Sequence, residues 1–461
     1  MAKIRDYRIV ISENACENER RAAAFLRENV RLVTGKKLPL VSDSEEPVPL
    51  EIAVGKTNRE ELDGFRPTRY RDDALGGVWE YVVRRIGTRL YLTGLGLPPA
   101  VQPPYTSAYR LLDDGAIGTV MAAYHTVEKL LGYDFLYAAY EDFPESEDLE
   151  MPEDYDYAFT RERLRAEMPP LFDGAAIYVL ECAEELHWNM GAVIMKTKNG
   201  RLVVIDGGHE GETDRFLALL RHISGEEIPH VSAWLFSHMH RDHFGVYYTL
   251  CTEEKYRGAL TVGDFYCNLL TEEFYTTLAK EKNPRFAEVR RVMLASGEVT
   301  GATVHTVERG DSFDVDGLRF DVLHVPELKY ADKMNMNDSS VVYKMTVDGG
   351  QTWMLLGDAE FVCNNDLLEN ARDKLKSDVV QVGHHGCGNV SRECYAAIGA
   401  DAYVWQIGEK FWYSDGGEGL NSHNTGVIRT RAYMMGLGAK KENVHVVMDK
   451  ILASPLPIEI R

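Results

Sequence analysis

The sequence lacks the features of membrane and secreted proteins. No apolar run in its 461 residues approaches the ~20 residues that cross a bilayer. The first residues do not have the basic-then-apolar layout of a signal peptide. The seven cysteines are scattered and include no Cys-x-x-Cys pair, a pattern typical of reduced thiols rather than of a disulfide framework. We therefore expect a cytoplasmic protein without a membrane partner.

Basic residues are scarce relative to acidic ones. The chain has 51 Lys and Arg against 72 Asp and Glu, which gives a formal net charge of −21. Long nucleic acids are normally held by basic surface, so this balance argues against long nucleic acid as a partner. Hydrophobic residues make up 45% and charged residues 27%, as in ordinary globular proteins. The length exceeds what one core supports, so two or more domains are expected.

Two regions of different character flank an acidic segment. Residues 1–140 alternate strand and helix signals, for example a strand at 50–54 and an amphipathic helix at 22–33, and predict a small α/β domain. Residues 141–170 are acidic and punctuated by prolines, so we expect a linker there. Residues 171–461 form the second expected domain.

Four stretches of the first region are similar to those of a known accessory domain. They are Ile9–Ile11, Thr34–Pro39, Glu51–Thr57 and Gly118–Tyr124. Their order resembles the domain that precedes the catalytic barrel in several glycoside hydrolases. The resemblance implies a structural or positioning role for residues 1–140, with glycan binding as the alternative.

Three histidines and one aspartate are concentrated in the segment Ser237–His243. The mostly apolar run Val231–Phe236 before it predicts a buried strand. Because side chains alternate along a strand, His238 and His240 are expected to point to the same side. The aspartate and the third histidine follow on the turn, close enough to hold a second metal ion. The segment therefore predicts a metal site rather than a polar turn that happens to contain histidines.

Other predicted strands end in residues that suit the same site. Apolar strands are predicted directly before Asp206, before Gly357 and Asp358, and before the pair His384 and His385. Strands that deliver polar residues from their ends onto one rim can build a metal site.

Together these motifs resemble those of the metallo-β-lactamase superfamily, over residues 171–461. Within the superfamily, the pattern is most similar to the hydrolase domain of ComEC-type competence proteins. The resemblance implies an α/β (α+β) chain whose second domain is an αβ/βα sandwich, with two mixed sheets face to face, helices outside and metals at one edge. Besides the histidine cluster, it rests on Val204–Gly208, Asn337–Ser340, Leu356–Asp358 and His384–Cys387.

The resemblance also implies a set of ligands. His238 and His240 would bind one metal, and Asp358 would bridge it to the other. Asp242, His243 and one histidine of the 384–385 pair would bind that second metal. We prefer His384, the first histidine after the strand, as the ligand, and expect His385 either to contact substrate or to support a ligand from behind. Asp206 is expected to accept hydrogen bonds beneath the site rather than to bind metal.

The sequence departs from the superfamily pattern after the predicted strand that contains His324. Many members supply a further histidine to the first metal from a Gly-His-Thr segment, where this chain has Asn335, Asn337 and Asp338. The first metal is therefore expected to be held weakly, and Asn337 becomes a candidate substrate contact. His324 is expected to be a packed histidine in preference to a ligand.

Two further positions are compared with the competence proteins. Cys387 stands where those proteins have serine, and we expect a small filler residue rather than a thiolate ligand. His423 lies in an expected exposed loop near a position where they carry a histidine. It is a candidate substrate contact, with an ordinary surface histidine as the alternative.

The predicted chemistry is hydrolysis assisted by two divalent transition-metal ions, zinc first, with manganese or iron as alternatives. Two adjacent cations lower the pKa of a shared water, and Asp242 is the expected catalytic residue that accepts or orients its proton. The favoured substrate is a phosphodiester in a small or short molecule. One alternative is a carboxylic ester, lactone or amide hydrolase of the same fold. The other is a carbohydrate-associated binding protein with a vestigial metal site.

Overall fold

The computed structural model describes residues 2–71, 77–97, 115–137, 146–186, 188–278, 283–415 and 419–461. Two compact units divide the chain. The first contains residues 1–166, 183–187 and 413–424, and the second contains residues 167–182, 188–412 and 425–461. In the described part of the chain, every helix is too short or too polar to cross a bilayer.

The first unit is built on one six-stranded sheet. Helix α1 (Glu17–Thr34) turns an apolar face that includes Leu26 and Val30 toward the core and ends at Gly35. Helix α3 (Ile117–Lys129) packs against α1 and against the sheet. The unit is therefore an α/β layer, as expected for residues 1–140. The strands, in their order across the sheet, are β2 (Leu40–Ser42), β1 (Arg8–Ile11), β3 (Glu51–Val54), β6 (Arg89–Gly94), β5 (Tyr81–Ile86) and β8 (Asp156–Phe159).

Part of the expected acidic linker belongs to this folded unit. Strand β8 pairs antiparallel with β5, and helix α4 (Arg161–Ala166) follows it directly. Residues 141–145 of the expected linker lie outside the described residues. Residues 413–424 also belong to the first unit, although the stretch from Phe411 to Asn424 was expected to be an exposed loop of the second domain. Asp415 of this stretch is buried and accepts a hydrogen bond from the Tyr124 hydroxyl at 2.5 Å. Smaller elements of this half of the chain are α2 (Arg59–Leu62), β4 (Tyr70–Arg71) and β7 (Gly96–Leu97).

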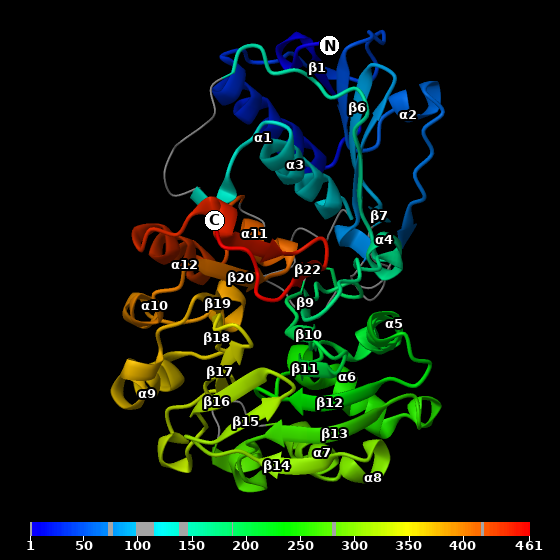
Figure 1. Ribbon diagram of the computed structural model, residues 1–461. Helices are drawn as coiled ribbons and strands as arrows, with labels where there is room; N and C mark the ends of the chain where they lie inside the picture. Colours follow the sequence, from blue (N-terminus) through cyan, green and yellow to red (C-terminus); the bar gives the residue numbers. More distant parts are fainter. Residues whose placement is uncertain are drawn as a thin grey trace. The chain divides into compact units, whose positions relative to one another are not determined.

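The second unit contains two seven-stranded sheets (Figure 1). In the first, the run from β11 to β14 is parallel, and in the second the run from β18 to β21 is parallel. The first sheet has the order β14 (Thr303–Thr306), β13 (Thr261–Cys267), β12 (His230–Leu235), β11 (Leu202–Asp206), β10 (Ala192–Lys196), β9 (Ala176–Val179) and β22 (Leu452–Pro455). The second has the order β15 (Ser312–Val315), β16 (Leu318–His324), β17 (Val342–Val347), β18 (Thr352–Leu355), β19 (Val379–Gln381), β20 (Ala402–Gln406) and β21 (Val444–Val447).

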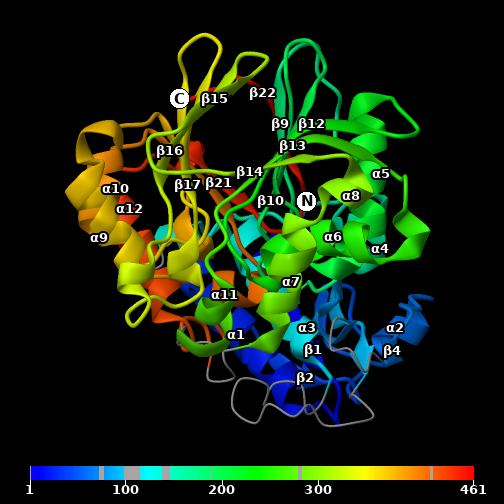
Figure 2. The ribbon, with the colours of Figure 1, turned by 90° about the horizontal axis from the view of Figure 1, so that it is seen from below.

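The two sheets of this unit share a core, and helices cover their outer faces (Figure 2). Leu235 of β12 packs in the same apolar cluster as Trp353 of β18, between the sheets. The neighbouring Trp234 points the other way and packs with Phe244 of α6, as strand alternation requires. The expected sandwich with helices outside is thus confirmed. The helices are α5 (Thr213–Ser224), α6 (Arg241–Thr252), α7 (Pro284–Leu294), α8 (Gly297–Thr300), α9 (Phe361–Asn370), α10 (Arg392–Ile398), α11 (Glu409–Tyr413) and α12 (Thr425–Gly436).

Candidate metal centre

The histidine cluster lies at the carboxyl end of β12, in the interior of the first sheet. After the strand, His238 and His240 flank Met239, whose side chain is fully buried. Helix α6 begins at Arg241, so Asp242 and His243 occupy its first turn. Because β11 and β12 are parallel, Asp206 at the end of β11 lies at the same edge as the cluster.

The second sheet delivers its residues from β18 and β19. Asp358 follows β18 after Leu356 and Gly357, and it is almost fully buried. His384 and His385 lie in a turn after β19 and have φ angles of 46° and 51°. Such left-handed angles are uncommon for residues other than glycine and are concentrated at functional sites. Both sheets therefore present potential ligands at one edge.

These side chains form two groups that could each hold a metal ion. One group is Asp242, His243, Asp358 and His385, and the other is His238, His240 and Asp358. In each group, one ligand atom from every residue lies within 4.8 Å of the others. Asp358 is common to both groups, as the expected bridging role requires.

The two carboxylate oxygens of Asp358 face different groups. Its Oδ1 lies 3.2 Å from His243 Nε2 and 3.5 Å from His385 Nε2. Its Oδ2 lies 3.7 Å from His238 Nε2. A single carboxylate in this position can therefore contact two cations, one through each oxygen.

The donor atoms converge as metal ligands do, and not all of them are satisfied by hydrogen bonds to one another. His238 Nε2 lies 3.1 Å from His240 Nδ1, and His385 Nε2 lies 3.3 Å from His243 Nε2. Asp358 Oδ1 is buried and makes no hydrogen bond of good geometry with a described residue. Converging imidazole nitrogens and carboxylate oxygens are the ligands of zinc, manganese and iron, so the residues suit a divalent transition metal.

Hydrogen bonds beneath the centre fix the ring orientations. His243 Nδ1 donates to Asp206 Oδ2 at 2.8 Å, and His385 Nδ1 donates to the Gln406 carbonyl at 3.0 Å. Both rings thereby turn Nε2 toward Asp358. Asp206 also accepts bonds from the backbone N–H and the hydroxyl of Ser237, at 2.8 and 2.7 Å. It thus occupies the expected place of a hydrogen-bond acceptor beneath the site, and it belongs to neither metal group.

The geometry reverses our preference within the 384–385 pair. His385, and not His384, belongs to the group with Asp242 and His243. His384 turns Nε2 toward the other oxygen of Asp358, at 3.8 Å from Oδ2. The preference for His384 assumed that the first residue after a strand enters the site, but the left-handed turn places both rings at the centre.

Asn337 contacts the centre directly, with its Nδ2 3.3 Å from His384 Nε2, and also through Glu360, a residue that the sequence analysis missed. Glu360 forms an ion pair with His384 Nδ1 at 2.8 Å. It also accepts hydrogen bonds from Asn337 Nδ2 at 3.0 Å and from Asn335 Nδ2 at 2.8 Å. These amides therefore hold the carboxylate that orients His384. Glu360 lies only two residues after Asp358, but no spacing in the sequence marks it out.

Three other expected residues lie outside both groups. His324 donates from Nδ1 to buried Asp366 at 2.6 Å, as expected for a packed histidine. Cys387 Sγ contacts Asn189 Nδ2 at 3.6 Å and is not part of a metal group. His423 lies in the first unit, where its backbone N–H donates to the Ser414 carbonyl. Its role as a substrate contact stays a prediction.

The buried groups around Asp358 have pKa values shifted in both directions. Burial lowers the pKa of His238 well below its usual range. Burial acts in the same direction on His243, yet the carboxylates of Asp358, Asp206 and Asp242 raise its pKa well above the usual value. Burial alone would raise the pKa of Asp358, but the surrounding imidazoles, with His243 foremost, hold it well below its usual range. The ionised carboxylates that raise the pKa of His243 would also attract a metal cation.

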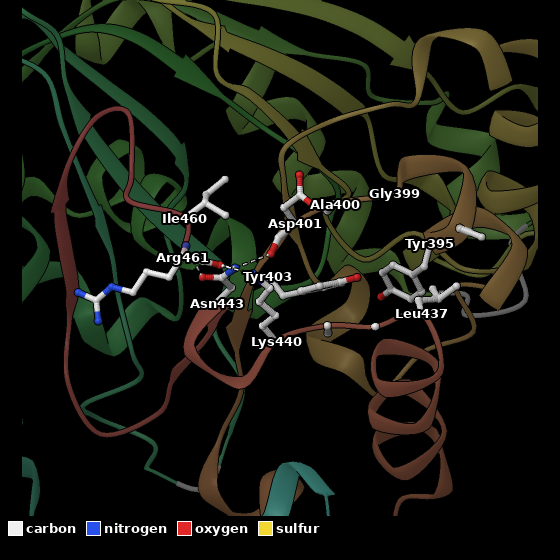
Figure 3. A pocket seen from close by; sticks show the side chains of 13 residues that line it. Tyr395, Gly399, Ala400, Asp401, Tyr403, Leu437, Lys440, Asn443, Ile460 and Arg461 are labelled. Carbon is white, nitrogen blue, oxygen red and sulfur yellow. Dashed lines mark hydrogen bonds between the residues drawn. The ribbon is translucent and has the colours of Figure 1, made fainter.

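A separate cavity of about 380 Å³ lies in the second unit (Figure 3). Its polar groups bond mainly to one another. Asn443 Nδ2 donates to the carbonyls of Asp401 and Arg461, and Lys440 Nζ donates to the carbonyl of Arg461. Neither metal group contributes a residue to its lining, so we assign no ligand to it.

Comparison with known families agrees with this geometry. Residues 189–392 match the family model described as the Metallo-beta-lactamase superfamily. This part of the chain is a metallo-beta-lactamase superfamily domain. The match covers both metal groups and lies within the second unit. Members of the superfamily are generally hydrolases. The resemblance of the first unit to a glycoside hydrolase accessory domain is not confirmed and stays a prediction.

Individual relatives are distant. ComE operon protein 3 of Bacillus subtilis (strain 168) is 28% identical over 168 residues, which are 36% of this chain and 19% of that protein. The chain thus spans about a fifth of this relative. Among solved structures, YhfI from Bacillus subtilis is 12% identical, with coverage of 61% of this chain and 100% of that chain and a TM-score of 0.35. CmlA, a diiron beta-hydroxylase from Streptomyces venezuelae, is 13% identical, with coverage of 62% and 55% and a TM-score of 0.39.

Proposed function

We propose that the second unit is a dinuclear metal-dependent hydrolase that cleaves a phosphodiester in a small or short substrate. The observation that supports this most is the position of Asp358, whose two oxygens face two separate ligand groups. A single bound ion would need only one of these groups. A shared carboxylate is what places two cations close enough to act on the same bond.

The first ion would be held by His238, His240 and Asp358, and we propose His384, which lies outside the group formed by these three residues, as its fourth ligand. Its Nε2 lies 3.8 Å from Asp358 Oδ2, the oxygen that lies 3.7 Å from His238 Nε2. Glu360 fixes the opposite nitrogen of the His384 ring, as a supporting carboxylate does for metal-binding histidines. In this role His384 would replace the further superfamily histidine that the sequence lacks near Asn337.

The second ion would be held by Asp242, His243, Asp358 and His385. Two bound cations would supply a water of lowered pKa and neutralise the negative charge on the oxygens of the attacked phosphate. Within this group Asp242 is the residue open to solvent, with 23% of its side chain exposed, whereas His243 and His385 are buried. Asp242 can therefore accept or orient a proton on the substrate side of the centre, which is the catalytic role proposed for it.

The test is turnover by metal-replete protein. We expect hydrolysis of bis(p-nitrophenyl) phosphate, one or two transition-metal ions per chain by elemental analysis, and a kcat lowered about 10²- to 10⁴-fold by Asp242→Asn. The matched control is Asp264→Asn, which alters a partly exposed carboxylate on β13 that pairs with His305 at 2.7 Å. Protein that binds no metal after reconstitution would contradict the proposal.

The same centre could cleave a carboxylic ester, lactone or amide. Comparing p-nitrophenyl acetate with the phosphodiester under identical metal loading separates the two functions. Faster, metal-dependent turnover of the acetate would replace the phosphodiester with an ester in the proposal. Glycan binding that survives chelation, without turnover of either substrate, would favour a binding protein with a vestigial centre.

A further inference from the structure

Helix α7 carries an arginine that contacts α6, the helix whose first turn supplies two residues of the metal centre. The helix packs against α6, which carries Asp242 and His243 in its first turn (Figure 2). On α7, the ring of Phe286 lies 6.4 Å from the ring of His240, measured between centroids. Arg285, the residue before it, has 43% of its side chain exposed. The carboxylate of Glu210 links the Arg285 guanidinium to Arg241, which lies between His240 and Asp242 in the sequence, so the exposed guanidinium lies near the start of α6.

The guanidinium of Arg285 is held in a fixed position. Its Nη2 pairs with one oxygen of Glu210, and the other oxygen of Glu210 lies 3.4 Å from Arg241 Nε. The guanidinium carbon also lies 6.0 Å from the ring centroid of Phe244 and 5.9 Å from that of Tyr248. An arginine fixed by a carboxylate and two ring faces loses less freedom on binding than a mobile surface side chain.

Neighbouring carboxylates balance the charge of Arg285 but do not use all of its N–H donors. Arg241 and Arg285 are opposed by Glu210 and by Glu288, whose carboxylate accepts a hydrogen bond from the Tyr248 hydroxyl at 2.9 Å. The two arginines and two glutamates sum to zero charge. The net charge of this cluster therefore does not attract an anionic ligand. A guanidinium has five N–H donors in a planar fork, and the contact to Glu210 uses Nη2. The remaining donors match the oxygens of a phosphate.

We propose that Arg285 binds a second phosphate group of the substrate, distinct from the diester that is cleaved. This proposal rests on the proposed phosphodiesterase function and defines its substrate class: a short phosphodiester that carries another phosphate close by. Glu210 and the aromatic rings act as positioning groups for the guanidinium.

The test compares two substrates that differ only in that phosphate. Thymidine 5′-(p-nitrophenyl phosphate) is assayed with and without a 3′-phosphate. We expect the 3′-phosphate to raise kcat/KM about tenfold in the wild-type protein through a lower KM, and Arg285→Gln to abolish this preference. The matched control is Arg291→Gln on the same helix. Arg291 is exposed and bonds the carbonyl of Ala287 in its own helix, so its substitution should keep the wild-type ratio.

A binding measurement tests the second phosphate site without relying on turnover. Thymidine 3′,5′-bisphosphate should bind metal-replete wild-type protein about tenfold more tightly than thymidine 5′-monophosphate, and Arg285→Gln should remove the difference. Cleavage of both substrates without a preference, or a preference that survives Arg285→Gln, would overturn the role of Arg285 and leave the phosphodiesterase function intact. Failure to cleave any phosphodiester would refute that function, and equal binding of the two nucleotides would then refute the second phosphate site as well.

Discussion

Asp358 is the residue on which the proposed dinuclear centre depends most directly. Its carboxylate lies 3.2 to 3.8 Å from imidazole nitrogens of four histidines, which come from both sheets. Asp358→Asn keeps the size of the side chain but removes the charge and turns one oxygen into an N–H donor. Both ions would thereby lose a negatively charged ligand, so the change should weaken both at once.

The expected loss follows from the burial of the site. Removing one partner of a buried charge pair costs about 3–5 kcal/mol, and ~1.4 kcal/mol corresponds to a tenfold change in a binding constant. Asp358 is 1% exposed, so solvent screening does not reduce this figure. Metal affinity in Asp358→Asn should therefore fall roughly a hundred- to several-thousand-fold for each ion.

The assay is competition for zinc between the protein and a chromogenic chelator, combined with elemental analysis after gel filtration. Asp264→Asn serves as the control, because it removes a carboxylate beside a histidine in the same domain but outside the centre. Melting of the metal-free proteins separates a folding defect from a binding defect. An Asp358→Asn protein that folds and holds two ions with wild-type affinity would refute the shared-carboxylate arrangement.

Three further predictions follow from the same geometry. His384→Asn and His385→Asn should each weaken a different ion, so each variant should retain about one ion per chain and the double variant none; elemental analysis that finds two ions in either single variant contradicts this. Asp206→Asn should lower metal affinity about 10- to 100-fold in chelator titrations, because His243 loses its orienting acceptor. Asp366→Asn should destabilise the fold by about 3 kcal/mol at pH 7 in urea unfolding. Burial would raise the pKa of Asp366, but its bond to His324 and its Arg309 partner hold it below the usual range. Its contribution is present above the unfolded value of about 4 and disappears as the pH falls through the folded value, so wild type and variant should converge in acid.

The sequence predicted the part of the centre that is local along the chain. His238 to His243 follow one strand and begin one helix, so strand alternation and the turn suffice to bring their side chains together. Asp358 was also predictable, because an apolar strand ends just before it. Glu360 was not, because its importance arises from Asn335 and Asn337, which reach it from another segment.

The domain boundaries were also hard to predict from the sequence, because they depend on contacts between segments that are distant in the chain. Strand β8 contains Asp156 and Tyr157 and lies at the edge of its sheet, where charged and polar residues are usual. Its composition therefore resembles that of a linker, although its backbone pairs with β5. The segment 413–424 was assigned to the second domain by its position in the chain, whereas the burial of Asp415 against Tyr124 places it in the first unit. Both errors concern pairings between distant segments.

The consecutive residues His384 and His385 both turn a ring nitrogen toward Asp358. In an extended strand, neighbouring side chains point to opposite faces, and only one ring could reach the centre. Left-handed backbone angles cost of order 1–3 kcal/mol each and persist only when the surroundings enforce them. Here the following glycines make the turn possible, since a Cβ at Gly386 would lie 2.1 Å from the Trp405 ring and one at Gly388 would lie 2.6 Å from His384 Nδ1. The pattern His-His-Gly-x-Gly thus encodes a strained turn whose two rings face the two oxygens of Asp358.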